Sequence, residues 1–218
     1  MKKDSTSNEA DCGKNRSALH RFAESRMVWF ACLVLLFVLS GCTTTIVPPS
    51  VPQGEAARVA IVDYGHHASL VLPDGRNGAV EYEYGEWRWF ALGQTGSPRI
   101  IPTLFWPTQG ALGRRIHNHP VDPVILRQTK EDANEVMSFY VPAHAVTRLR
   151  ERLNGRYESN IETEVENPEW GMTFVKDPAR YSAFHNCNHR LALWLRELGC
   201  ETRGHATFAM FRVKERNR

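Results

Sequence analysis

A cysteine at the start of an amphipathic segment is the residue of this sequence best suited to covalent chemistry. Cys187 follows Asn186, whose side-chain oxygen can accept a backbone N–H of a first helical turn. Unpaired N–H groups and the helix dipole favour an anion at such a position, so the pKa of the thiol falls. The spacing therefore suits Cys187 to nucleophilic attack. The alternative interpretation is an inert cysteine buried in a core.

A thiol nucleophile needs a base within hydrogen-bond reach, and the base needs an orienting acceptor. His67 is the expected base because it leads directly into an apolar strand, whereas His66 points to the opposite face. Glu81 on the following strand is the expected orienting carboxylate, and Glu83 on the same face is the alternative. The sequence therefore predicts that Cys187, His67 and Glu81 meet in the folded protein.

The segment that positions Cys187 has the pattern of a helix. Its apolar side chains recur at i, i+3, i+4 and i+7 and predict a stripe that faces a core: Leu191, Trp194, Leu195 and Leu198. Cys187 lies four residues before this stripe begins, so its sulfur is expected on the same inward face. Gly199 is expected to end the helix in a left-handed conformation.

The rest of the chain predicts an antiparallel sheet with few helices. Residues 57–63, 67–72 and 79–84 are predicted strands of one antiparallel meander. Further predicted strands are residues 124–127, 136–141, 172–175 and 207–213. A helix is predicted over residues 143–153 and ends at Gly155, and residues 86–92 are predicted to be a short helical or irregular aromatic segment. For residues 93–120, punctuated by proline and glycine, the prediction is a loop with one short helix.

The N-terminal segment has the pattern of an export signal. Residues 1–27 are polar and basic, and residues 28–39 form an apolar run of 12. As a helix, this run rises about 18 Å, which is too short for a hydrocarbon core of roughly 30 Å. The sequence LSGC at positions 39–42 resembles the bacterial lipobox, which implies cleavage before Cys42 and acylation of that residue. Thr43 in place of an aspartate implies sorting to the outer membrane.

The predicted domain organisation has three parts. Residues 1–41 are the lipoprotein signal peptide, residues 42–55 a proline-rich tether, and residues 56–218 a single domain. The chain has 27 Lys and Arg against 24 Asp and Glu. Removal of the signal peptide takes away six basic and four acidic residues, which leaves a net charge of +1. Such a balance gives no basis for a nucleic-acid partner, and membrane attachment is expected through the lipid on Cys42.

The cysteine count predicts a free thiol. Cys187 and Cys200 lie at opposite ends of one predicted helix, about 20 Å apart by helical rise. A disulfide requires Cα atoms within about 7 Å, so these two cysteines are not expected to pair. An oxidising periplasm permits disulfides, so a thiol that stays free there is expected to have a function.

Neither a metal nor another cofactor is predicted. His117 and His119 are spaced so that they can share a strand face, but two histidines lack the third ligand that a zinc site needs. A metal-binding protein that uses some of the nine histidines is kept as a further hypothesis.

Three stretches together resemble a little-characterised family of small bacterial exported proteins. They are residues 65–72 (GHHASLVL), Glu81 followed by Gly85, and the helix that begins at residues 186–188 (NCN). That family has a His-x-Gly-Leu-Val-Leu strand, a Glu followed by Gly-Asp, and a Cys-Asn-Thr-Trp helix. Here serine, glutamate and His-Arg replace the glycine, the aspartate and the Thr-Trp of those motifs.

More distantly, the NCNH sequence at residues 186–189 is similar to the Asn-Cys-Glu-His motif of lecithin:retinol acyltransferase-like proteins. Those belong to the circularly permuted papain-like (NlpC/P60-type) thiol hydrolases and acyltransferases, in which the histidine strand precedes the cysteine helix. The resemblance implies an α+β fold with an antiparallel sheet packed against the cysteine helix. It also implies Cys187 as nucleophile, His67 as base and Glu81 as a third member.

The expected function is that of a lipid-anchored periplasmic thiol hydrolase or acyltransferase. The resemblance implies a cell-wall peptide or a lipid acyl group as substrate, attacked at an amide or ester carbonyl. The alternative is a non-catalytic binding or structural lipoprotein of the envelope, in which bulky His189 and Arg190 occlude the thiol.

Overall fold

The structure, a computed structural model, describes residues 43–95, 106–130, 132–206 and 210–214. The chain divides into two compact units, Met1–Gly41 and Cys42–Arg218. The predicted signal peptide and the predicted lipidation site Cys42 lie outside the described residues. Within the described residues, no helix has the length and apolar character needed to cross a bilayer.

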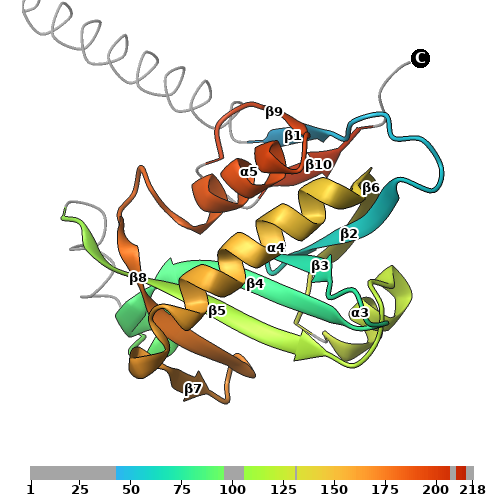
Figure 1. Cartoon of the computed structure of the whole chain (residues 1–218). Helices are drawn as coiled ribbons and strands as arrows, with labels where there is room; N and C mark the ends of the chain where they lie inside the picture. The colour runs from blue at the N-terminus through green and yellow to red at the C-terminus, as the bar shows by residue number, and fades with distance from the viewer. Residues whose placement is uncertain (1–42, 96–105, 131, 207–209, 215–218) are drawn as a thin grey trace, which may run out of the picture. The chain divides into compact units, whose positions relative to one another are not determined.

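Seven antiparallel strands form the main sheet, in the order β6-β2-β3-β4-β5-β8-β7 (Figure 1). Their bounds are β2 Ala56–Asp63, β3 Ala68–Pro73, β4 Ala79–Glu86, β5 Thr108–His117, β6 Glu135–Pro142, β7 Val165–Asn167 and β8 Met172–Tyr181. The meander predicted from residues 57–84 is confirmed as β2, β3 and β4. These strands form because runs of β-branched and aromatic residues are separated by turn sequences such as PDG.

The alternation along β4 explains the two faces of the sheet. Val80, Tyr82 and Tyr84 belong to the main core cluster. Successive side chains of a strand point to opposite faces, so Glu81 and Glu83 project from the other face. Both carboxylates are nevertheless buried, because further elements cover that face as well.

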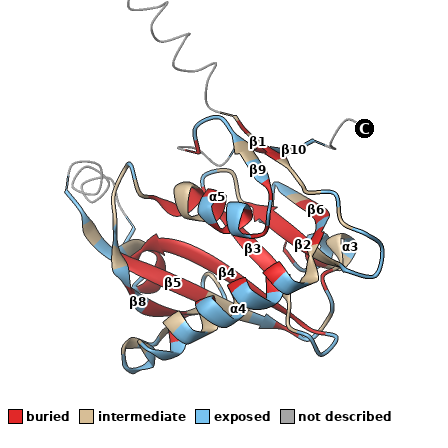
Figure 2. Cartoon of the chain, turned by 45° about the horizontal axis from the view of Figure 1, so that its top comes forward, coloured by how far each residue is buried: buried red, intermediate tan, exposed pale blue. Residues whose placement is uncertain are grey.

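Two helices pack on the core face of the sheet. They are α4 Ala143–Glu158 and α5 Cys187–Glu197, and Figure 2 shows the central strands buried beneath them. The opposite face is covered by α3 Pro123–Thr129 over β2 and β3, and by a π-helical turn, η1 Trp87–Ala91, over β5 and β8.

The helix that carries Cys187 begins and ends as its sequence predicts. The Asn186 side chain accepts the backbone N–H of His189, so it is the N-cap. Gly199 adopts a φ of +88°, a left-handed conformation in which a side chain is strained. The predicted apolar stripe is buried against the sheet, with Leu191 and Leu195 inaccessible to solvent.

A second, three-stranded sheet joins the two ends of the described chain. Its order is β10-β1-β9, with bounds β1 Thr44–Val47, β9 Glu201–Arg203 and β10 Phe211–Val213. The structure here differs from the tether predicted for residues 42–55. Ile46 is fully buried in the main core cluster, because the β-branched run TTIV finds pairing partners more than 150 positions further along the chain.

The prediction for residues 93–120 is wrong in the part that the structure describes. Thr108–His117 is a ten-residue strand, β5, that pairs with β4 on one side and β8 on the other. Gly110 and Gly113 suggested a loop, but in the sheet they leave room for bulky neighbours. Residues 96–105 lie outside the described part of the chain.

The strand predicted over residues 124–127 is a helix. The Asp122 side chain accepts the backbone N–H groups of Val124 and Ile125, at 2.8 and 3.1 Å, and caps α3. Pro123 occupies the first helical position, where its fixed φ suits a helix. These local signals outweigh the β-branched content of the segment.

Other elements extend beyond their predicted bounds. Helix α4 continues past Gly155 to Glu158, and β8 continues past residue 175 to Tyr181. A 3-10 turn, η2 Ile161–Thr163, and β7 occupy a stretch predicted to be a loop. Of the strand predicted over residues 207–213, residues 211–213 form β10, and residues 207–209 lie outside the described residues.

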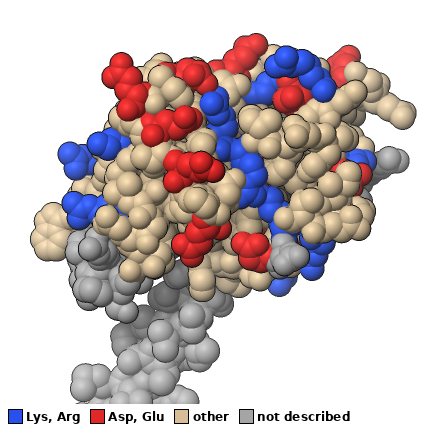
Figure 3. All heavy atoms as spheres, turned by 90° about the horizontal axis from the view of Figure 1, so that it is seen from below, with Lys and Arg blue, Asp and Glu red and all other residues tan. Residues whose placement is uncertain are grey.

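The unit Cys42–Arg218 is thus a mixed α/β fold with a mostly antiparallel sheet and a few helices, as predicted at that level. Its charges are mixed as well. On the face shown in Figure 3, Lys and Arg side chains form a band with Asp and Glu side chains on both sides.

Candidate functional site

His67 and Glu83 form a buried pair. His67 Nε2 lies 2.8 Å from Glu83 Oε2. The two residues are only 4% and 1% exposed. His67 immediately precedes β3, and Glu83 lies near the end of the neighbouring strand β4. The pair therefore joins the segment before β3 to the central strand β4 of the sheet.

The thiol of Cys187 lies beside the same imidazole. It interacts with the His67 ring through hydrogen bonding and charge. Because Glu83 occupies Nε2, Nδ1 is the nitrogen left for the thiol, although Nδ1 has no aligned hydrogen bond to a described residue. Catalytic hydrogen bonds are often poorly aligned until a substrate is bound. The structure thus brings together the cysteine and the histidine that the sequence paired.

The ends of two strands make this meeting possible. Pairing between β3 and β4 runs from Pro73↔Ala79 to Leu70↔Tyr82 and does not continue to His67. The strands therefore part where β4 carries Glu83. Helix α5 packs against both strands, and its first residue reaches the imidazole at this opening.

The charge state of the site follows from its burial and its carboxylate. Burial alone lowers the pKa of His67, because the protonated ring loses hydration. The Glu83 carboxylate and Cys187 outweigh this effect and raise the pKa of His67 to about 10. At neutral pH the ring is therefore protonated. The protonated imidazole and the first turn of α5 thus both lie at the Cys187 side chain.

A tyrosine hydroxyl is the third group at the sulfur. Burial raises the pKa of Tyr181 above its usual range, and the charge and hydrogen bonding of Cys187 raise it further. The phenol therefore stays protonated and can donate a hydrogen bond. Tyr181 ends β8 opposite Thr108 of β5, and its ring stacks on Tyr84 at 5.9 Å between centroids.

Aromatic rings enclose the imidazole on the side away from α5. The Phe90 ring centroid lies 4.6 Å from that of His67, and the Trp170 and Tyr64 centroids lie at 6.1 and 6.2 Å. These rings shield the imidazole from bulk water, which strengthens its interaction with charged neighbours.

Glu81 lies in a separate network and does not contact His67 in the structure. Its carboxylate is fully buried and accepts several hydrogen bonds or ion pairs. The donors are Ser69 Oγ at 2.6 Å, Lys130 Nζ at 2.6 Å, His117 Nε2 at 2.9 Å, Tyr64 OH at 3.1 Å and an Arg115 guanidinium nitrogen at 3.5 Å. Burial raises the pKa of Glu81, but the hydrogen bonds and the arginine charge outweigh it and hold the pKa below its ordinary value.

The structure therefore assigns the carboxylate beside His67 to Glu83, where sequence reasoning preferred Glu81. The two residues share a face of β4, so periodicity cannot distinguish them. Register does: Glu83 pairs with Gly113 of β5, which leaves space over the strand, whereas Glu81 pairs with Arg115. Sequence reasoning also missed Tyr181, because β8 was not expected to extend so far.

The other predicted features of the site are placed as follows. His66 is exposed, and both His66 and His67 precede β3 instead of lying within the strand as predicted. His117 serves the Glu81 network and lies 5.0 Å from His119 between ring centroids. In the described part of the chain, His, Cys, Asp and Glu residues form no group of three or more that is arranged to hold a metal ion.

The polar contacts of the bulky residues His189 and Arg190 are with residues other than Cys187. His189 Nδ1 lies 2.8 Å from the Asn186 side-chain oxygen. The Arg190 guanidinium lies 2.7 Å from His185 Nε2 and above the Tyr84 ring. The second thiol, Cys200, is free and buried like Cys187, in agreement with the prediction that the two do not pair.

Comparisons with known proteins give no match, so the function is inferred from the chemistry of this site. No family model matches the sequence, and neither the curated proteins nor the solved structures contain a match.

Proposed function

We propose that this protein is a thiol hydrolase or acyltransferase that acts on an amide or ester. Cys187 is the nucleophile, His67 the acid and base, and Glu83 the residue that orients the imidazole. The observation that carries the proposal is the buried chain of three side chains, with Glu83 on Nε2 and the thiol beside the ring. A nucleophile, a base and an orienting carboxylate in contact form the arrangement that acyl transfer requires.

The proposed reaction has two steps. The Cys187 thiolate attacks the carbonyl carbon, and the imidazolium of His67 gives its proton to the departing amine or alcohol as the thioester forms. Neutral His67 then takes a proton from water, or from an acceptor alcohol or amine, as that oxygen or nitrogen attacks the thioester. The product acid, ester or amide leaves, and the proton on His67 returns the imidazolium–thiolate pair.

The tetrahedral intermediate carries a negative oxygen that needs donors. The first backbone N–H groups of α5 have no intrahelical partner by geometry, and they point out of the helix at Cys187. The protonated Tyr181 hydroxyl lies at the same sulfur and supplies a second donor. Both groups support the proposal that this end of α5 is an oxyanion site.

The proposed fold relationship and location follow the sequence. The histidine strand precedes the cysteine helix, as in the permuted papain-like enzymes, and an antiparallel sheet packs on that helix. We propose attachment to the outer membrane through lipidated Cys42, with the domain facing the periplasm. A cell-wall peptide or a lipid acyl group is the proposed substrate class.

One observation favours a second candidate, a non-catalytic binding protein of the envelope. Cys187 is only 5% exposed, so a substrate carbonyl needs local movement to reach the sulfur. The two candidates differ in the ionisation of the thiol. A retained but inactive site allows an ordinary thiol pKa of about 8.5, whereas the enzyme needs the thiolate at neutral pH.

Labelling with iodoacetamide, read out by peptide mass spectrometry at each cysteine, tests the proposal. We expect Cys187 to react at pH 7 and the Cys187→Ser protein to lose this label. The His67→Ala protein should react at about one tenth of the native rate or more slowly, because an ordinary thiol is only a few per cent thiolate at that pH. Burial raises the pKa of Cys200 to about 12, so Cys200→Ser is the matched control and keeps the Cys187 label. Equal rates in the native and His67→Ala proteins would overturn the proposal.

A further inference from the structure

A cavity lies on the Glu83 side of the catalytic group, on the face of the sheet away from α5. Its volume is about 190 Å³, more than ten times the roughly 15 Å³ that one water molecule needs. Its lining includes Glu83, Lys130, Arg115 and Tyr64, whereas Cys187 and His67 do not line it. A ligand in this cavity therefore touches the carboxylate behind the imidazole and not the thiol.

One oxygen of Glu83 indicates that the cavity binds a ligand. Oε2 of Glu83 contacts His67, but Oε1 is buried and has no hydrogen-bond partner among the described residues. A buried carboxylate oxygen without a protein donor needs another donor, because burial removes it from bulk water. A protonated amine in the cavity satisfies this oxygen and complements its charge.

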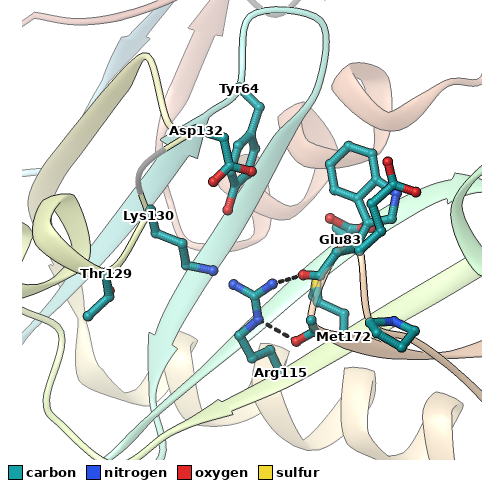
Figure 4. A pocket seen from close by; sticks show the side chains of 11 residues that line it. Tyr64, Glu83, Arg115, Thr129, Lys130, Asp132 and Met172 are labelled. Atoms are coloured by element: carbon teal, nitrogen blue, oxygen red, sulfur yellow. Dashed lines mark hydrogen bonds between the residues drawn. The ribbon is translucent and has the colours of Figure 1, made fainter.

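Lys130 and Arg115 form the cationic side of the cavity, whose lining also includes the acidic residues Asp132 and Glu169. Lys130 Nζ and Arg115 both approach the same oxygen of Glu81, at 2.6 and 3.5 Å, and His117 shares that oxygen. Two permanent positive charges thus share one carboxylate oxygen of Glu81. Figure 4 shows Lys130 and Arg115 projecting side by side into the pocket, with Glu83 across from them. The remaining donors of Lys130 suit an anionic group of a ligand.

The surroundings hold these groups in place. Arg115 donates to the backbone carbonyls of Trp170 and Gly171, which fixes its guanidinium at the cavity wall. Lys130 is only 5% exposed, so its ammonium is held in the wall by burial and by Glu81. Rigid, partly desolvated charges of both signs in one small cavity select a ligand that carries both signs.

We propose that this cavity binds a small zwitterion of the α-amino-acid class, with its ammonium on Glu83 Oε1 and its carboxylate on Lys130 and Arg115. Binding does not require a reactive thiol. Where the proposed function holds, the bound ammonium weakens the influence of Glu83 on His67, so the ligand slows the reaction at Cys187. This second consequence rests on the proposed function.

Calorimetric titration of the full chain with glycine tests the site, with methylammonium and acetate as its two half-molecules. We expect saturable glycine binding that exceeds binding of either half by about tenfold or more, since each charged contact is worth about that factor. The Cys187→Ala protein should bind glycine equally well, which separates this test from that of the thiol chemistry.

Three substitutions locate the site. Glu83→Gln and Arg115→Gln should each weaken glycine binding about tenfold or more. Arg114→Gln is the matched control, because Arg114 is the next residue of β5 but pairs with Glu158 on the other face, and it should leave binding unchanged. Circular dichroism confirms that each variant is folded, and Arg115→Gln keeps the test valid should Glu83→Gln unfold.

Two results would overturn the proposal. One is the absence of saturable glycine binding by the folded native protein. The other is binding that neither Glu83→Gln nor Arg115→Gln changes, or that acetate matches, since the cavity would then hold water or a simple anion instead of a zwitterion.

Discussion

At the scale of single residues, two glutamates of one strand have different chemistry because they meet different neighbours. Glu83 faces an imidazole and a cavity, so its charge controls the protonation of His67. Glu81 pairs with cationic side chains and accepts a hydrogen bond from the Ser69 hydroxyl. The same type of side chain therefore sets the charge of an imidazole at one position and pairs with buried cations at the other.

Substitution of each glutamate by glutamine should separate these roles. Glu83→Gln removes the charge that raises the pKa of His67, so iodoacetamide labelling of Cys187 at pH 7 should slow about tenfold. Glu81→Gln leaves the buried Lys130 ammonium short of its counter-ion, which should cost about 3–5 kcal/mol in the free energy of unfolding. Urea unfolding measures the second effect. Labelling of the folded Glu81→Gln protein should remain near the native rate, and a loss equal to that of Glu83→Gln would contradict the division.

The protonated imidazole also predicts a pH dependence of stability. The pKa of His67 is about 10 in the folded protein and about 6.5 in an unfolded chain. A raised pKa stabilises the fold fully below about pH 6.5, and the contribution is lost as pH rises through about 10. We expect the Tm of the native protein to fall more steeply between pH 7 and 10.5 than that of His67→Gln. Circular dichroism melts measure both, and parallel curves would refute a protonated His67.

At the scale of secondary structure, the site depends on how strands are paired. Gly113 of β5 lies opposite Glu83, and an added Cβ would lie 2.6 Å from Glu83 Cγ and 2.6 Å from a carbon of the Phe174 ring. Neither neighbour is free to withdraw, because both are buried in the sheet. The missing side chain thus sets the direction in which Glu83 leans.

Gly113→Ala should therefore disturb the site through the sheet. We expect slower labelling of Cys187, as Glu83 shifts from His67, and a loss of about 1–3 kcal/mol in stability from overpacking. Gly155→Ala is the matched control: that glycine lies in α4 with open space around the added methyl group. The control should be neutral or up to about 1 kcal/mol more stable, because alanine favours a helix. If Cys187 of the Gly113→Ala protein were labelled at the native rate, Glu83 would have room to adjust, which would contradict this prediction.

At the scale of the whole molecule, the small sheet joins both ends of the domain to its core. Strand β1 begins at Thr44, and Ile46 packs with Phe211 of β10 in the main core cluster. The first described strand thus begins two residues after Cys42. An acylated Cys42 would consequently hold the domain close to the membrane surface.

The anchor itself gives a clear prediction. In a bacterial host, Cys42→Ser should move the protein from the membrane fraction to the soluble fraction, because the remaining domain has no lipid to retain it. Fractionation with immunodetection measures the change, and incorporation of labelled palmitate should be lost with it. Cys200→Ser is the control and should stay with membranes. Unchanged membrane association of Cys42→Ser would exclude the lipid anchor.

Much of the fold could be predicted from local signals. The helix at Cys187 has an N-cap, an apolar stripe and a terminal glycine, each of which acts within a few residues. The meander of β2, β3 and β4 also followed from alternation and turns. Strand β5 could not be recognised, because its glycines resemble loop residues until the side chains that pack over them are known.

By itself, the sequence determined that a cysteine begins an amphipathic helix and that a histidine enters a strand, because capping and periodicity are local properties. Only the tertiary structure decided which carboxylate meets that histidine and that Tyr181 reaches the sulfur. It also decided that the chain just after Cys42 is part of the fold. These outcomes depend on strand register and on contacts between distant segments. Alternation along a strand places Glu81 and Glu83 on the same face, and only the register with the neighbouring strand distinguishes them.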